Sequence, residues 1–362
     1  MRLSAVMGCK PLVGAIVAAV AYLTSPIALA QTPAVPAVAL PATFRNAPAD
    51  AIESRAHDAA LGEPALARLI ALAHTHNPAR AQAVARISST RRTFGGGDIE
   101  LRMHRAELAR LDHQLAEEIA HAWFDWHAAA ARLAIADVLD ALAAQGLQLV
   151  NQRLAAGLAT QADLERMHEA AIKARSLRAR AVQERGAAAA RIAALTGEQG
   201  APAVATAPAQ DTPRASITVP AAPPAPAAAT GALASPIRAA APAALFERPD
   251  VRAARVRLEV PGTSPAELAA FYREAVLKAL EETETAYAAA VSARAQRSTA
   301  AELRATAERQ QTAVLAQLEA GRVGRLQHIE AQLAAQEAQL RVTDAEAAYA
   351  KSLATLERML GN

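Results

Sequence analysis

A glycine turn occurs twice in this 362-residue chain, first in RLAAGLATQADLE (residues 153–165) and again in QLEAGRVGRLQHIEAQ (residues 317–332). The two turns lie 164 residues apart, and the same shift superimposes several other landmarks without a gap. These pairs are Glu117 with Glu281, Glu118 with Glu282, Trp123 with Tyr287, Gly157 with Gly321, and Gly197 with Gly361. Because self-similarity at a fixed spacing marks a repeated structural unit, the chain is predicted to contain two copies of one unit.

Each copy is predicted to be a long α-helical hairpin. In the first copy, apolar residues recur at steps of three, four or seven, which marks one buried helix face. They are Leu108, Leu111, Leu115, Ile119, Trp123, Trp126 and Leu133. The pattern runs from about Asp98 to Ala156, breaks near Gly157 and ends at Gly197. In the second copy the apolar positions recur every seven residues, the spacing of left-handed supercoiled packing. They are Leu326, Leu333, Leu340 and Ala347.

The composition favours the same fold class, mostly α. Hydrophobic residues make up 52% of the chain but aromatic residues only 3%, which argues against a sheet-rich fold and against a self-sufficient outer-membrane barrel. Lys and Arg number 38 and Asp and Glu 35, a net charge of +3, and the two signs are interleaved. This pattern is typical of solvated helix faces, and it does not indicate nucleic-acid binding.

Residues 1–30 are predicted to be a secretory signal peptide. Arg2 and Lys10 precede an apolar core, and Ala28-Leu29-Ala30 supplies a small-residue cleavage site. The mature protein is therefore expected to be exported and to have no transmembrane helix. Cys9 is the only cysteine, so the mature chain is expected to form no disulfide.

Four segments are expected after the leader. They are an Ala/Pro-rich N-terminal segment, a first helical-hairpin repeat, an Ala/Pro-rich linker and a second helical-hairpin repeat, with limits 31–64, 65–197, 198–243 and 244–362. Inside the first repeat, SSTRRTFGGG (88–97) is predicted to break the helical pattern before Asp98, a helix N-cap.

Five stretches in this order resemble a known family. The opening helix of that family is similar to LARLIALAHTHNPARAQAVARI (66–87), and its second repeat opens with a signature similar to LFERPDVRAA (245–254). Its second long helix begins in a way that resembles YREAVLKALEETETA (272–286), and both glycine turns resemble its helix-to-helix turns. The chain thus resembles the TolC family of outer-membrane efflux proteins, in particular the NodT-like branch.

The resemblance implies a function. Members of the family are trimers whose long helices form a periplasmic tunnel, and a β-barrel continues the tunnel through the outer membrane. Their hairpin tips face a periplasmic adaptor (membrane fusion) protein and an inner-membrane pump. The chain is therefore expected to be an outer-membrane or periplasmic component of a tripartite efflux system, a helical conduit that exports small molecules.

One departure from the family leaves a second function open. The two strand pairs of the barrel belong between Ile87 and Asp98 and between Leu258 and Tyr272, but only ten and 13 residues lie there. Two membrane-crossing strands of about ten residues each do not fit. The alternative is a soluble periplasmic helical protein that binds an adaptor or a full-length homologue and forms no channel.

The helical tips are the candidate partner-binding sites. The resemblance assigns docking on the adaptor to the first tip, which comprises Ala156, Gly157, Leu158, Ala159 and Thr160, and to the second tip, which comprises Gly321, Arg322, Val323 and Gly324. Glycine allows a close approach of a partner backbone, and Leu158 offers an apolar anchor. The alternative is a plain helix end, with Gly157 as C-cap and Thr160 as the next N-cap.

Enzyme functions find little support. Glu118 with His121 and Glu165 with His168 have the spacing of di-iron carboxylate bundles, but a turn at Gly157 places the two pairs far apart along the hairpin. A surface metal site of His113, Glu117 and His121 lacks a second helix to complete it. The sequence therefore predicts no catalytic residues, no metal and no cofactor.

Overall fold

The computed structural model describes residues 35–50, 52–53, 63–94, 99–197, 237–260 and 264–361. Most of these residues are helical. The predicted leader (1–30) lies outside the described residues, and so does the predicted linker apart from residues 237–243.

Two tandem helical hairpins make up the structure, so the predicted fold class is confirmed. The first repeat contains α2 (Pro64–His76), α3 (Pro78–Phe94), α4 (Ile99–Ala155) and α5 (Gln161–Thr196). The second contains the 3-10 helix η3 (Pro242–Glu247), then α7 (Pro249–Arg257), α8 (Pro265–Glu319) and α9 (Arg325–Met359). In the described ranges the only strands are β1 (Ile52–Glu53) and β2 (Arg238–Ala239), which pair in parallel with Ile52 opposite Arg238.

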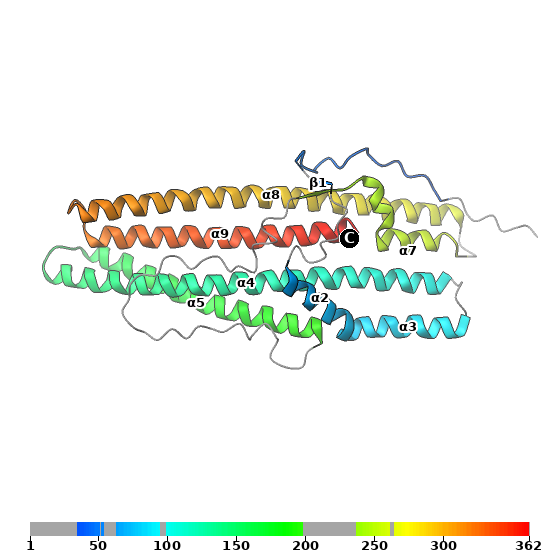
Figure 1. Cartoon of the computed structure of the whole chain (residues 1–362), viewed down its shortest axis with the longest axis horizontal. Helices are drawn as coiled ribbons and strands as arrows, with labels where there is room; N and C mark the ends of the chain where they lie inside the picture. The colour runs from blue at the N-terminus through cyan, green and yellow to red at the C-terminus, as the bar shows by residue number, and fades with distance from the viewer. Residues whose placement is uncertain are drawn as a thin grey trace, which may run out of the picture.

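The four long helices lie side by side in one layer. Helix α4 packs against α5 and α9, and α9 packs against α8, so the order across the layer is α8, α9, α4, α5. Both hairpin tips lie at the same end of this layer, and α3 and α7 lie at the other end (Figure 1). The layer leaves one flank of α5 and one flank of α8 without a neighbouring helix.

Each repeat contains one junction, at mid-length of the layer, where hydrogen bonds connect two of its helices. Asn77 caps two helices at once, because its Nδ2 donates to the carbonyl of Leu195 at 2.9 Å and its Oδ1 accepts from the backbone N–H groups that begin α3. In the second repeat the buried Arg248, which precedes α7, donates to the carbonyl of Met359 at 3.4 Å. Each junction thus joins the end of a long helix to the start of a short one, α5 to α3 and α9 to α7.

The connections opposite the tips are shorter than the sequence suggested. The predicted break at 88–97 is wrong in its first part, because α3 continues through Phe94 and only four residues separate it from α4. Helix α8 begins at Pro265 instead of near Tyr272, which leaves seven residues after α7. A pair of membrane-crossing strands fits in neither connection. Asp98, the predicted N-cap, lies outside the described residues.

Helix α4 forms the centre of the core. Trp123, Phe124 and Trp126 are buried among residues of α2, α5 and α9, as expected for the apolar face of this helix. One stretch of α4 is also long and apolar enough to cross a membrane, and 39% of that stretch is buried inside the structure. One helix of this kind is weak evidence for a membrane span, because core helices of helical proteins give the same signal.

Candidate functional site

The first tip is built by a glycine cap and a capping box. The N–H of Leu158 donates to the carbonyl of Arg153 at 2.8 Å, and Gly157 has a φ of +70°, a backbone conformation that favours glycine. Three residues after Gly157, Thr160 is the N-cap of α5. Its N–H donates to the Asp163 carboxylate at 2.9 Å, and its Oγ1 accepts from the Asp163 N–H at 3.2 Å. The hydrogen bonds from Thr160 lower the pKa of the Asp163 carboxyl.

The second tip repeats this cap with different side chains. The N–H of Arg322 donates to the carbonyl of Gln317 at 2.8 Å, and Gly321 has a φ of +68°. Gly324 begins α9, and its N–H donates to Oε1 of Gln327 at 2.8 Å. The backbone of the two turns is therefore equivalent, and the turns differ in what they expose.

Leu158 is the apolar feature of this end of the molecule. It is 69% exposed, whereas its neighbour Ala159 packs against the cluster beneath the tip and Val323 is half-buried. At the position equivalent to Leu158, the second tip carries the exposed Arg322. The plain-cap interpretation accounts for Gly157 and Thr160. What distinguishes the first tip from the second is the exposed Leu158 that follows its glycine.

The two tips are also joined to each other, which the sequence analysis missed. Nη1 of Arg166 lies 3.2 Å from Oε1 of Glu330, and Arg166 also pairs with Asp163. The guanidinium of Arg153 lies against Gly324, 3.3 Å from the place of a β-carbon there. Arg166 and Glu330 are separated by 164 residues, the same shift that superimposes the two repeats. Opposite charges at superimposed positions were therefore a signal in the sequence for this ion pair.

The polar face of α4 that includes Glu117, His121 and Asp125 contacts α9. Oδ1 of Asp125 lies 2.7 Å from Nζ of Lys351, and Glu117 pairs with Arg358. The Nε2 of His121 lies 3.1 Å from both the Lys351 carbonyl and the Thr355 hydroxyl. Among the described residues no three His, Cys, Asp or Glu side chains come close enough to hold a metal ion. The side chains of this face serve packing between α4 and α9.

The Glu-x-x-His pairs also stay apart. Glu118 lies 3.2 Å from Arg191 across to α5, while Glu165 and His168 are exposed on the outer side of α5. The two pairs lie on different helices, Glu118 and His121 on α4 and Glu165 and His168 on α5. The side chains brought together at one end of the layer are those of the two tips.

Several solved structures have the same arrangement of helices. A membrane protein from Pseudomonas aeruginosa is 17% identical over 91% of this chain and 100% of that chain, with a TM-score of 0.64. CusC, studied for its folding and transmembrane channel formation, is 15% identical over 92% and 98% of the two chains, with a TM-score of 0.67. The open MtrE outer membrane channel of Neisseria gonorrhoeae is 16% identical over 92% and 97%, with a TM-score of 0.62.

No family model matches the sequence, and no curated protein matches it. At identities of 15–17% the likeness to these structures concerns the fold. The TolC-like fold implied by the resemblance of five stretches of the sequence is confirmed. The solved structures of this fold named above are channels or membrane proteins by description.

Proposed function

We propose that this chain, which has the TolC-like fold, is the outer-membrane or periplasmic component of a tripartite efflux system and forms a helical conduit for small molecules. The observation that carries the proposal is the single layer of four long helices with both tips at one end (Figure 1). A homotrimer closes three such layers into a tube by placing α5 of one copy beside α8 of the next. The conduit acts by passive passage and performs no chemistry on its cargo.

The edge helices support assembly between copies. Helix α5 exposes Ile172 at 63% and Val182 at 50%, and α8 exposes Leu303 at 45%. Large exposed apolar side chains on the two edge helices favour burial against another copy. A closed ring leaves neither flank in water.

The tips supply the contact with the adaptor protein, which in turn contacts the inner-membrane pump. Gly157 has no heavy atom within 4 Å of where its β-carbon would be, so a partner backbone can approach it closely. Beside it, Leu158 offers an apolar side chain whose burial in a pocket contributes about 2 kcal/mol. Gly321, Arg322, Val323 and Gly324 form the second, more polar half of the same surface.

Replacing Leu158 with aspartate is expected to abolish cross-linking to the adaptor and to leave helical content unchanged. The reason is that a charged carboxylate is not desolvated in an apolar pocket, while the turn itself depends on Gly157. The measurement is cross-linking from a single cysteine at position 322, since Cys9 is the only natural cysteine and lies in the predicted leader. Val84→Asp, 39% exposed and at the opposite end, is the control. Undiminished cross-linking of the Leu158→Asp variant would overturn the assigned site.

A second function is favoured by the short connections. Only four residues join α3 to α4 and seven join α7 to α8, so the chain has no room there for membrane-crossing strands. A periplasmic protein that binds an adaptor or a full-length homologue, without forming a channel, fits this observation. An alkaline carbonate wash of outer membranes separates the two functions: retention favours the conduit, and recovery in the soluble periplasm favours the binding protein.

A further inference from the structure

The end of the molecule opposite the tips carries a concentration of positive charge. It consists of the described residues 78–94, 99–110, 249–260 and 264–278, which include α3, α7 and the first turns of α4 and α8 (Figure 1). These residues, here called the basic end, contain twelve Arg or Lys and six Asp or Glu, a net charge of +6. The whole chain carries +3, so the remainder is net negative. The two signs are interleaved along the chain, so this excess of positive charge is seen only when the helix ends are brought together.

Most of these cations face water without a carboxylate partner. Arg80 is paired with Asp112 at 2.7 Å, and Arg102 holds Glu259 with both of its terminal nitrogens. Seven other arginines are exposed, and no carboxylate among the described residues lies within 4 Å of them. They are Arg86, Arg91, Arg92, Arg105, Arg252, Arg255 and Arg273. The positive charge of these seven arginines is therefore not compensated by ion pairs within the described part of the molecule.

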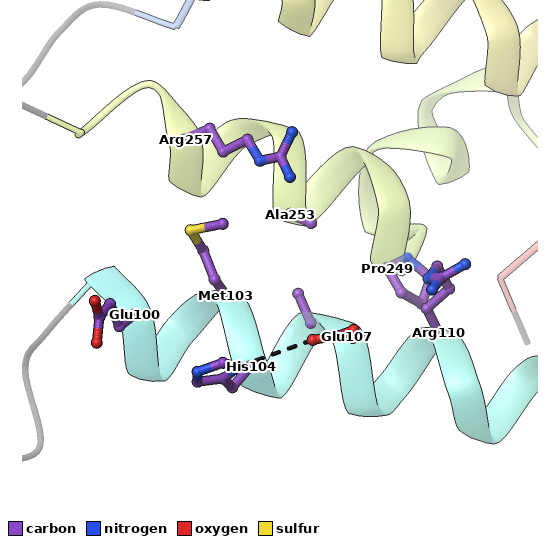
Figure 2. A pocket seen from close by; sticks show the side chains of 9 residues that line it. Glu100, Met103, His104, Glu107, Arg110, Pro249, Ala253 and Arg257 are labelled. Atoms are coloured by element: carbon purple, nitrogen blue, oxygen red, sulfur yellow. Dashed lines mark ion pairs between the residues drawn. The ribbon is translucent and has the colours of Figure 1, made fainter. Parts of the chain in front are cut away.

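The basic end also has a shallow hollow and an exposed aromatic side chain. The hollow, about 470 Å³ in volume, lies between α4 and α7, with Arg110 on the α4 side and Arg257 on the α7 side (Figure 2). Two acidic residues, Glu100 and Glu107, also line it, and Glu107 lies 3.8 Å from His104 (Figure 2). Phe271 is 39% exposed, and the guanidinium of Arg257 lies 4.9 Å from the centre of its ring. Cations mixed with a large apolar side chain are typical of surfaces that meet lipid headgroups.

We propose that the basic end docks on an anionic phospholipid surface. Arginine binds phosphate groups through paired N–H donors, and each cation near an anionic membrane strengthens the attraction. The arginines are supplied by α3, α4, α7 and α8, whose ends meet at this place, so a flat membrane can contact several of them at once. The layer then stands with its tips pointing away from the lipid.

A membrane is favoured over nucleic acid as the partner. Aromatic residues make up 3% of the chain, so few side chains can stack on nucleic-acid bases. The predicted leader would export the protein from the cytoplasm. In the compartment that it then enters, the extended anionic surfaces are membranes. Phe271 beside Arg257 fits the boundary between headgroups and acyl chains.

The test is flotation of the mature chain with lipid vesicles. We expect binding to vesicles of phosphatidylcholine with phosphatidylglycerol, little binding to phosphatidylcholine alone, and weakening with added salt. The variant Arg91→Gln/Arg92→Gln/Arg255→Gln is expected to lose at least about tenfold in partitioning. Its control is Arg180→Gln/Arg309→Gln/Arg325→Gln, which removes the same charge from exposed arginines outside the basic end and should bind within about twofold of the wild type.

Three outcomes would overturn the inference: equal binding to neutral vesicles, an equal loss in the control variant, or tighter binding to duplex DNA than to vesicles. Circular dichroism of both variants checks that they fold. The test needs neither adaptor nor pump, so its result is separate from that of the proposed conduit. Leu158→Asp should float like the wild type, because Leu158 lies at the other end of the layer (Figure 1).

Discussion

Replacing Arg248 with methionine is expected to lower the free energy of unfolding by about 3 kcal/mol. Arg248 is 3% exposed, and its Nη2 lies 2.7 Å from both Asp250 and Glu282. Its Nη1 also donates to the carbonyl of Met359 at the end of α9. Methionine fills the space but leaves two carboxylates without their cation and the end of α9 without its donor. Chemical unfolding followed by circular dichroism measures the loss.

The matched control is Arg102→Met. Arg102 makes an equally close pair with Glu259, but both side chains are more than a third exposed, so at most about 1 kcal/mol should be lost. Arg248→Lys should fall between the two variants, because an ammonium group does not reach two carboxylates and a carbonyl in the same fixed geometry. Equal, small losses in Arg248→Met and Arg102→Met would show that the junction of α9 with α7 does not depend on Arg248.

Acid is expected to destabilise the fold through His127. Its ring is buried and lies edge-on to Trp123 and Trp126, with ring centres 4.3 and 4.8 Å away. Burial lowers the pKa of His127 from 6.5 to about 4. His127 therefore takes up a proton at a higher pH in the unfolded chain than in the folded chain. The free energy of unfolding is not reduced by this group above pH 6.5, and it falls as the pH drops from 6.5 toward 4. The total loss from this group is about 3 kcal/mol.

The variant His127→Leu removes this part of the pH dependence. Carboxylates titrate in the same range, so the measured quantity is the difference between wild type and variant in unfolding free energy at pH 7 and at pH 4. Leu142→Ala, at a position of α4 that is 2% exposed, is the control and should lower stability equally at both pH values. An unchanged pH dependence in His127→Leu would contradict the assigned cause.

The regular part of the fold could be predicted from the sequence. The apolar period and the glycines placed the first arm from about Asp98 to Ala156, and α4 runs from Ile99 to Ala155. Gly157, Gly197, Gly321 and Gly361 all have positive φ, as expected where a helix stops at glycine. These features are local, so they are visible in a single sequence.

The junctions and the basic end could not be predicted in the same way. Asn77 contacts Leu195, and Arg248 contacts Met359, across more than a hundred residues, and no periodicity encodes such a contact. The segment Ser88–Phe94 has little apolar character, yet it is helical because α3 packs along α4. The arginines of the basic end become one surface only when four helix ends meet. The positions of the tips could be predicted from the sequence because a glycine marks each turn.

Each junction lies wholly within one repeat, since Asn77 and Leu195 belong to the first and Arg248 and Met359 to the second. Between the repeats, α4 packs against α9 and α7, and α5 contacts α9 near the tips through Arg166 and Glu330. Residues of both repeats also share a core, in which Ala350 and Ala354 of α9 pack with Trp123 and Phe124 of α4. One repeat made alone would keep its own junction but would leave this apolar face of α4 uncovered.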